Sequence, residues 1–154
     1  MANYLKPVIF KLGSESYGID INLVSSIEKQ VSVVSVPNTL EYIKGIIKLR
    51  NEIIPVINLK KRFNMKDADI SGENAIIVKL PNITIAIEVD AVEEIHSIEE
   101  SEVVDMPTIV KTEDLKYFDK VVSVNGKLVV LINVNYLLSE SEQTSVANLT
   151  EKLS

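Results

Sequence analysis

The sequence predicts a mostly β fold made of two small β-barrels, and three observations support this prediction. Short runs rich in isoleucine and valine recur along the chain, and β-branched residues favour pleated, half-buried strands over helices. Compact turn signals separate these runs, of which Asn125-Gly126 is a strong two-residue hairpin signal. Two segments also resemble later segments in the same order, which indicates a duplicated β unit.

The first unit, residues 10–27, is typical of a strand, a turn at Gly13-Ser14, a short strand and one helical turn. It aligns without a gap with residues 78–95 at an offset of 68, and Pro81-Asn82 supplies the corresponding turn there. The order of the strands alone does not say which strands belong to which barrel.

The next segment, residues 43–63, predicts a strand, a tight turn and a second strand. Its charged turn is Arg50-Asn51-Glu52, and asparagine tolerates the left-handed conformation that such turns often need. Pro55 lacks an amide hydrogen, so the returning arm should be an edge strand or leave the ladder at that point. A guanidinium held on a rigid hairpin suits recognition of a partner better than catalysis.

The second unit repeats this hairpin, because residues 52–63 align with residues 127–138 at an offset of 75. We expect one domain, residues 1–154, with lobe one at about 7–66 and lobe two at about 73–138.

The C-terminal tail, residues 139–154, begins with SESEQTS, which is typical of a solvated linker. An amphipathic helix is then expected, with a frayed tail as the alternative. The apolar residues at helical spacing are Val146, Leu149 and Leu153.

Composition excludes several classes of protein. The net charge of −6 and pI near 4.9 argue against nonspecific nucleic-acid binding. The absence of cysteine excludes disulfides and thiolate zinc sites. No apolar run reaches the ~20 residues of a membrane span, and no signal peptide is recognisable, so a cytoplasmic protein without membrane insertion is expected. The basic cluster Lys60, Lys61 and Arg62 is either the solvated end of a strand or a contact for an acidic partner.

Residues that could carry chemistry are scarce. His96 is the only histidine, and the five glycines form no phosphate-binding loop. Residues 67–78 match the start of a calcium loop but have Val78 where the loop needs glutamate. The acidic run between Glu93 and Asp105 is interleaved with apolar residues and indicates an exposed face. No catalytic residue, cofactor or metal is therefore expected, and the chain is predicted not to be an enzyme.

The hairpin segment resembles the signature of the CheW family, the coupling proteins of bacterial chemotaxis. The matching positions are Lys44-Gly45, Leu49-Arg50 and residues 55–59, and the resemblance extends from about Val8 to Leu138. The departures from the signature are Lys48 for an asparagine, Asn51 for the turn glycine and Asn58 for a frequent aspartate. The resemblance implies two SH3-like five-stranded β-barrel lobes with short helices and a hydrophobic groove between the lobes.

The resemblance also implies a scaffold that joins chemoreceptors to the histidine kinase CheA. In CheW-like proteins the groove takes the tip of a receptor's helical hairpin, and barrel surfaces meet the regulatory domain of CheA. The positions tied to receptor coupling correspond here to Val24, Gly45, Arg50, Val89 and Val92.

Three of these positions have a structural alternative. Arg50 could bind a partner carboxylate or could fix the second lobe internally. Val24 could equally belong to the core, and Gly45 could serve close backbone approach or a positive φ. Asp119 stands where family members often have glycine, which leaves the kinase-facing details of the second lobe open.

Two other functions remain open from the sequence. One is a CheW-like adaptor of a different receptor–kinase pathway. The other is a small-ligand-binding β-barrel or an enzyme with an unrecognised site, which an interior pocket with convergent polar groups would favour over an open apolar groove.

Overall fold

The computed structural model describes residues 3–37, 40–66, 74–95, 97–105 and 117–153. It contains two large sheets, a small two-stranded sheet and two α-helices. The strands of the first half are β1 (Tyr4–Leu5), β2 (Pro7–Leu12), β3 (Glu15–Asp20), β4 (Val24–Glu28), β5 (Ile43–Leu49) and β6 (Glu52–Asn58), followed by helix α1 (Leu59–Arg62). The later elements are β7 (Asn74–Lys79), β8 (Thr84–Val89), β9 (Ala91–Ile95), β10 (Ile98–Glu99), β11 (Val104–Asp105), β12 (Phe118–Val124), β13 (Lys127–Ile132) and helix α2 (Glu140–Leu153).

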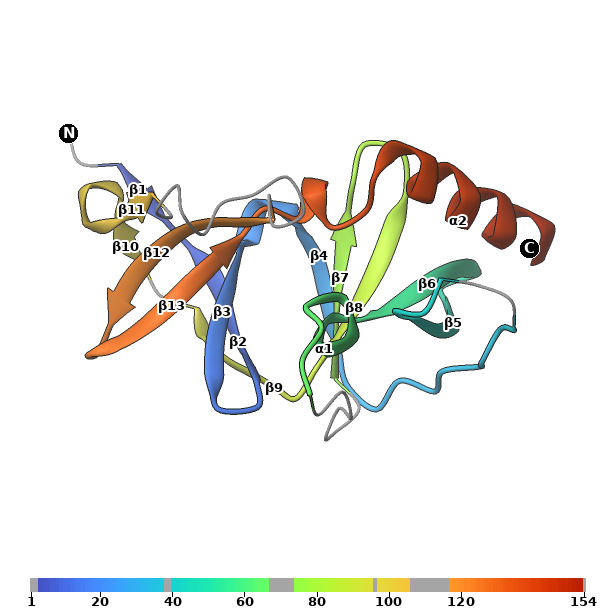
Figure 1. The fold of residues 1–154 in the computed structure, drawn as a ribbon, viewed down its shortest axis with the longest axis horizontal. Coiled ribbons are helices and arrows are strands. Elements are labelled where there is room, and N and C mark those ends of the chain that lie inside the picture. The colour runs from blue at the N-terminus through green and yellow to red at the C-terminus, as the bar shows by residue number, and fades with distance from the viewer. Residues whose placement is uncertain (1–2, 38–39, 67–73, 96, 106–116, 154) are drawn as a thin grey trace.

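The two large sheets lie side by side in Figure 1, with α2 beside the sheet on the right. One sheet has six strands in the order β11-β12-β13-β3-β2-β9, and the other has five in the order β4-β7-β8-β6-β5. The predicted mostly β, two-lobed fold is confirmed. Strand pairing among the described residues leaves edge strands in both sheets, so their ladders are open rather than closed into barrels.

The two sheets exchange one strand each. β4 follows β3 in the chain but pairs with β7, whereas β9 follows β8 but pairs with β2. The sheets therefore group the strands differently from a division of the chain at 7–66 and 73–138, and the expected lobe bounds stay a prediction. One sheet takes its strands from the middle of the chain, and the other combines strands from both ends.

The predicted duplication is visible in the register of the strands. Val24 on β4 lies opposite Val78 on β7. Val92 on β9 lies opposite Phe10 on β2 in the same way, and Val92 and Phe10 are the residues 68 positions from Val24 and Val78. The hairpins β5–β6 and β12–β13 also share one register, with an irregularity at the same place in each, at Lys44 and at Asp119.

Both hairpin turns have the same backbone conformation. Arg50 and Asn51 have φ of 50° and 66°, and Asn125 and Gly126 have φ of 51° and 79°. Positive φ at both central residues defines the type I′ turn, whose twist matches that of the flanking strands.

The apolar side chains form one central cluster and two smaller ones. The central cluster joins the two sheets and includes Phe10, Tyr17, Ile57, Ile76 and Val146. The interior of the five-stranded sheet is filled by Ile47, Ile54, Val56, Ala75, Ile77 and Ala86. The interior of the six-stranded sheet is filled by Ile9, Ile98, Val122 and Val129.

The C-terminal helix is confirmed, and it begins earlier than predicted. Ser139 and Glu142 form a capping box, in which the Glu142 amide donates to Ser139 Oγ at 3.1 Å and the Ser139 amide donates to Glu142 Oε1 at 2.9 Å. SESEQTS is therefore the start of α2 and not a linker. Val146 is buried in the central cluster, whereas the side chains of Leu149 and Leu153 lie outside the described part.

Candidate protein-binding surface

The β5–β6 hairpin presents Arg50 to solvent. The side chain of Arg50 is 71% exposed, and its Nη2 lies 3.7 Å from Glu28 Oε2 at the end of β4. β4 and β5 are the two edge strands of their sheet, so this contact joins the edges. A single long contact of a largely exposed guanidinium contributes little to stability, which leaves Arg50 available to a partner.

Gly45 allows the chain around Val34 to pack closely against β5 of the same hairpin. A Cβ at this position would lie 2.1 Å from the carbonyl oxygen of Val34, so only glycine lets the two backbones approach. Val34 and Ile46 donate to each other's carbonyl oxygens at 2.9 Å. Of the two structural alternatives for Gly45, close backbone approach applies. Val34, which is 63% exposed, is an apolar neighbour that the sequence interpretation missed, although its VSVVSV context is rich in the β-branched residues that favour strands.

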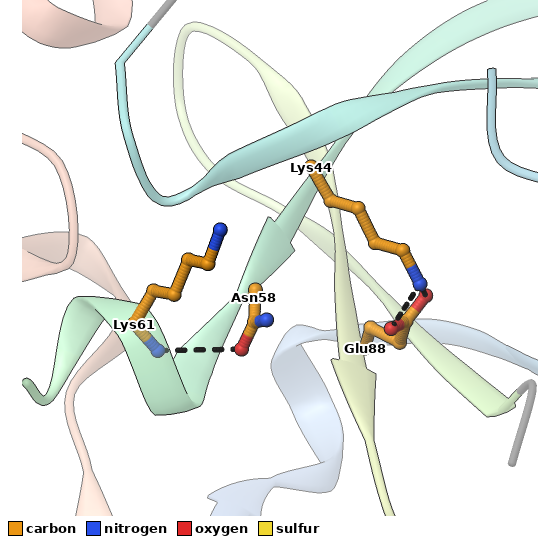
Figure 2. A network of polar contacts seen from close by, with 4 residues as sticks. All are labelled: Lys44, Asn58, Lys61 and Glu88. Carbon is orange, nitrogen blue, oxygen red and sulfur yellow. Dashed lines mark hydrogen bonds and ion pairs between the residues drawn. The ribbon is translucent and has the colours of Figure 1, made fainter. Parts of the chain in front are cut away.

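A polar network fixes the base of the hairpin (Figure 2). Lys44 Nζ donates to both carboxylate oxygens of Glu88, at 2.7 and 2.8 Å, and Glu88 is only 1% exposed. Asn58 Oδ1 accepts from the Lys61 amide at 3.3 Å and caps α1. The Lys44–Glu88 ion pair ties the hairpin to β8, and the Asn58 cap fixes the direction of the chain after β6. The role of Lys44 is therefore to neutralise the buried Glu88 carboxylate.

The three valines of the predicted receptor-binding set lie deeper than Arg50. Val89 is 0% exposed and belongs to the central cluster, so it cannot contact a partner in this structure. Val24 and Val92 are half-buried and pack against that cluster. Their place beside the core is the alternative that the sequence left open for Val24.

The basic cluster does not form one exposed patch. Lys60 is buried and its Nζ lies 2.9 Å from Asp90 Oδ2. Arg62 donates from Nε to the Leu137 carbonyl at 2.7 Å. Lys61 is exposed. Of the three predicted electrostatic contact residues, only Lys61 presents its side chain fully to an acidic partner.

Arg62 stands at the junction between the two sheets. Its guanidinium lies over the rings of Tyr42 and Tyr117, at 5.2 and 4.9 Å from their centres. The Tyr42 hydroxyl donates to Glu142 on α2, and burial together with this bond raises the pKa of Tyr42 well above its usual range. Burial acts to raise the pKa of Glu142, but the bonds from Tyr42 and Ser139 and the nearby Arg62 outweigh it and lower that pKa. α2 is thereby attached through a charged network.

The described part of the structure offers no built chemical site. No group of three or more His, Asp or Glu side chains in it could hold a metal. The interiors of both sheets are filled by aliphatic side chains, which does not favour the ligand-binding barrel. His96 and residues 67–73, which match the start of a calcium loop in sequence, lie outside the described residues. Within the described chain, no helix is long and apolar enough to span a membrane.

Comparisons with known proteins agree with this picture. The model of the CheW-like domain matches residues 6–142. The chemotaxis protein CheW of Treponema pallidum is 32% identical, over 92% of this chain and 86% of its own length. CheW of Bacillus subtilis is also 32% identical, over 92% of each chain. The crystal structure of the scaffolding protein TtCheW from Thermoanaerobacter tengcongensis superposes with a TM-score of 0.82 at 35% identity, covering 91% of this chain and 96% of its own.

CheW-family proteins are non-catalytic adaptors, in line with the prediction that this chain is not an enzyme. Because the family model spans most of the sequence and the strands follow the architecture of a solved family member, the chain belongs to the CheW family of chemotaxis proteins.

Proposed function

We propose that this protein is a cytoplasmic scaffold that joins the tips of chemoreceptors to the regulatory domain of the histidine kinase CheA. The observation that supports a partner-binding role best is the display of Arg50, an exposed cation on a rigid type I′ turn. A planar guanidinium can bind a partner carboxylate through two parallel hydrogen bonds. Exposed Val34 lies beside the same hairpin and supplies apolar contact area.

The receptor-binding residues in this proposal are the exposed Arg50 and Val34, together with the half-buried Val24 and Val92. Gly45 supports the surface through the backbone. The kinase would meet other parts of the molecule, among them α1, where Lys61 is an exposed cation of the predicted basic cluster.

Scaffolding needs only modest affinity at each surface. A dissociation constant of ~10 µM corresponds to about −7 kcal/mol. One molecule that engages two partners gains avidity without any further contact.

The test is calorimetric titration of a receptor-tip fragment, and separately of the CheA regulatory domain, with the full chain. Arg50→Ala should weaken receptor binding by about tenfold or more, because it removes a charge-assisted contact. It should change the free energy of unfolding by less than about 1 kcal/mol, because the Arg50 side chain is largely exposed and its contact with Glu28 is long. Lys48→Ala is the matched control, since Lys48 is an exposed cation on the same hairpin.

Unchanged receptor affinity in Arg50→Ala would refute the assigned receptor surface. Saturable kinase binding with no receptor binding would restrict the scaffold to one of its two proposed partners. Binding of neither partner would refute the proposed function.

A further inference from the structure

The outer face of β6 is covered by α2. Ile54 and Val56 point into the interior of the five-stranded sheet, so the alternate residues of β6 point outward. α2 packs against this strand and places Val146 in the same cluster as Ile57. Beneath the helix, Pro55 is buried and Ile53 is half-buried.

β13 is the structural counterpart of β6. Both strands return from a type I′ turn in the same hairpin register, since Leu49 lies opposite Glu52 and Val124 lies opposite Lys127. Each also pairs in parallel with one further strand, β6 with β8 and β13 with β3. The counterparts of the outward residues Ile53, Pro55 and Ile57 are therefore Leu128, Val130 and Ile132, 75 positions later.

No helix among the described residues covers the corresponding face of β13. Leu128 is 71% exposed, and Val130 is half-buried. A hollow of about 490 Å³ opens there, lined by residues 14–17 of the β2–β3 turn and β3 and by Lys127, Leu128 and Val130. In Figure 1 the β12–β13 hairpin lies at the left of the molecule, and α2 lies at its upper right.

We propose that this surface, the β13 seat, binds an amphipathic helix of a partner protein in the way that α2 occupies β6. The packing of α2 on β6 is the precedent within this molecule. There the outer face of the β5–β6 hairpin, next to β8, binds a helix that carries the β-branched Val146 at its centre. The β13 seat lies on the six-stranded sheet, whereas Arg50 lies on the five-stranded sheet, so this inference goes beyond the proposed receptor surface.

One cation and one carboxylate stand at the seat. Glu15 is exposed and accepts a hydrogen bond from the Tyr17 hydroxyl at 2.6 Å, which orients its carboxylate without removing the negative charge. Lys127 is exposed and stands where β6 has Glu52. A helix with an aliphatic stripe over Leu128 and a carboxylate near Lys127 would match both features.

The helix of this chain is itself an acidic amphipathic segment and provides the probe. A synthetic peptide of residues 139–154 is titrated into the isotope-labelled full chain and followed by the shifts of amide NMR signals. We expect saturable shifts at residues 14–17 and 127–130, and a peptide with Val146→Asp should lose them. Leu128→Asp in the full chain should weaken binding by about tenfold, the effect of losing one buried aliphatic contact.

Val104→Asp is the matched control, because Val104 is 64% exposed on β11 of the same sheet and should leave binding unchanged. If Leu128→Asp disturbs the fold, Lys127→Glu provides the second variant and should also weaken binding. Shifts confined to β6, which would mean exchange with the resident α2, would overturn the proposal. So would no shifts at millimolar peptide, or equal binding by the Leu128 variant and its control.

Discussion

Replacing Gly45 with alanine will detach the chain around Val34 from β5 and leave both sheets folded. The new Cβ would lie 2.1 Å from the Val34 carbonyl oxygen and 2.7 Å from its carbonyl carbon, so a backbone and not a side chain must move. The move breaks two hydrogen bonds of 2.9 Å between Val34 and Ile46. At about 0.5–1.5 kcal/mol each, the loss is about 1–3 kcal/mol. A loss of about 2 kcal/mol lowers the Tm of a domain of this size by roughly 4–8 °C.

Urea unfolding measures this loss, and amide hydrogen exchange locates it. In the Gly45 variant, the amides of Val34 and Ile46 should lose protection while the other strands keep theirs. Gly18→Ala is the control, because its Cβ would meet side-chain atoms and no backbone atom, with Leu131 Cδ2 at 2.9 Å and Pro7 Cβ at 3.2 Å. Wild-type unfolding with a protected Val34 amide would refute the reasoning.

Three further outcomes follow from the structure. Gly126→Val should destabilise by about 1 kcal/mol or more in urea unfolding, because φ of +79° strains a β-branched residue; unchanged stability would argue against the turn. Lys60→Met should cost about 3–5 kcal/mol in the same assay, because it leaves the Asp90 carboxylate buried without its cation; a loss below about 1 kcal/mol would contradict this. The pKa of Glu142 is lowered in the folded state, so its stabilisation is present above the ordinary carboxyl pKa and is lost as pH falls through the folded value. Glu142→Gln should remove that part of the acid dependence of unfolding, and an unchanged pH profile would show that Glu142 does not contribute.

Local turn chemistry explains why the hairpins could be predicted from the sequence. The type I′ turns depend on the residues within each turn, and Asn51, Asn125 and Gly126 tolerate the positive φ that such turns require. The conformation of Arg50 was not predicted, because arginine rarely adopts a φ of +50° and the two flanking strands impose it. The start of α2 could have been predicted, since Ser139 and Glu142 have the spacing of a capping box.

The strand exchange and the buried charges could not be predicted in this way. Local sequence patterns specify β4 and β9 as strands but contain no information on which sheet each joins. Lys60 stands in a basic run that is typical of a solvated end, and its partner Asp90 becomes adjacent only when α1 and β8 pack. Arg62 likewise contacts Tyr117, which is distant in the sequence, only through the tertiary fold.

Depth in the fold separates the predicted receptor-binding residues into two kinds. Arg50 can touch a partner directly, whereas Gly45 and Val89 can influence binding only through the shape of the sheet. A contact residue changes affinity with little change in the free energy of unfolding, and a supporting residue changes both. Loss of receptor coupling after a substitution at Val89 or Gly45 would therefore not identify a contact. The ratio of the two free-energy changes, measured on the same variant, distinguishes a displayed side chain from the scaffold that holds it.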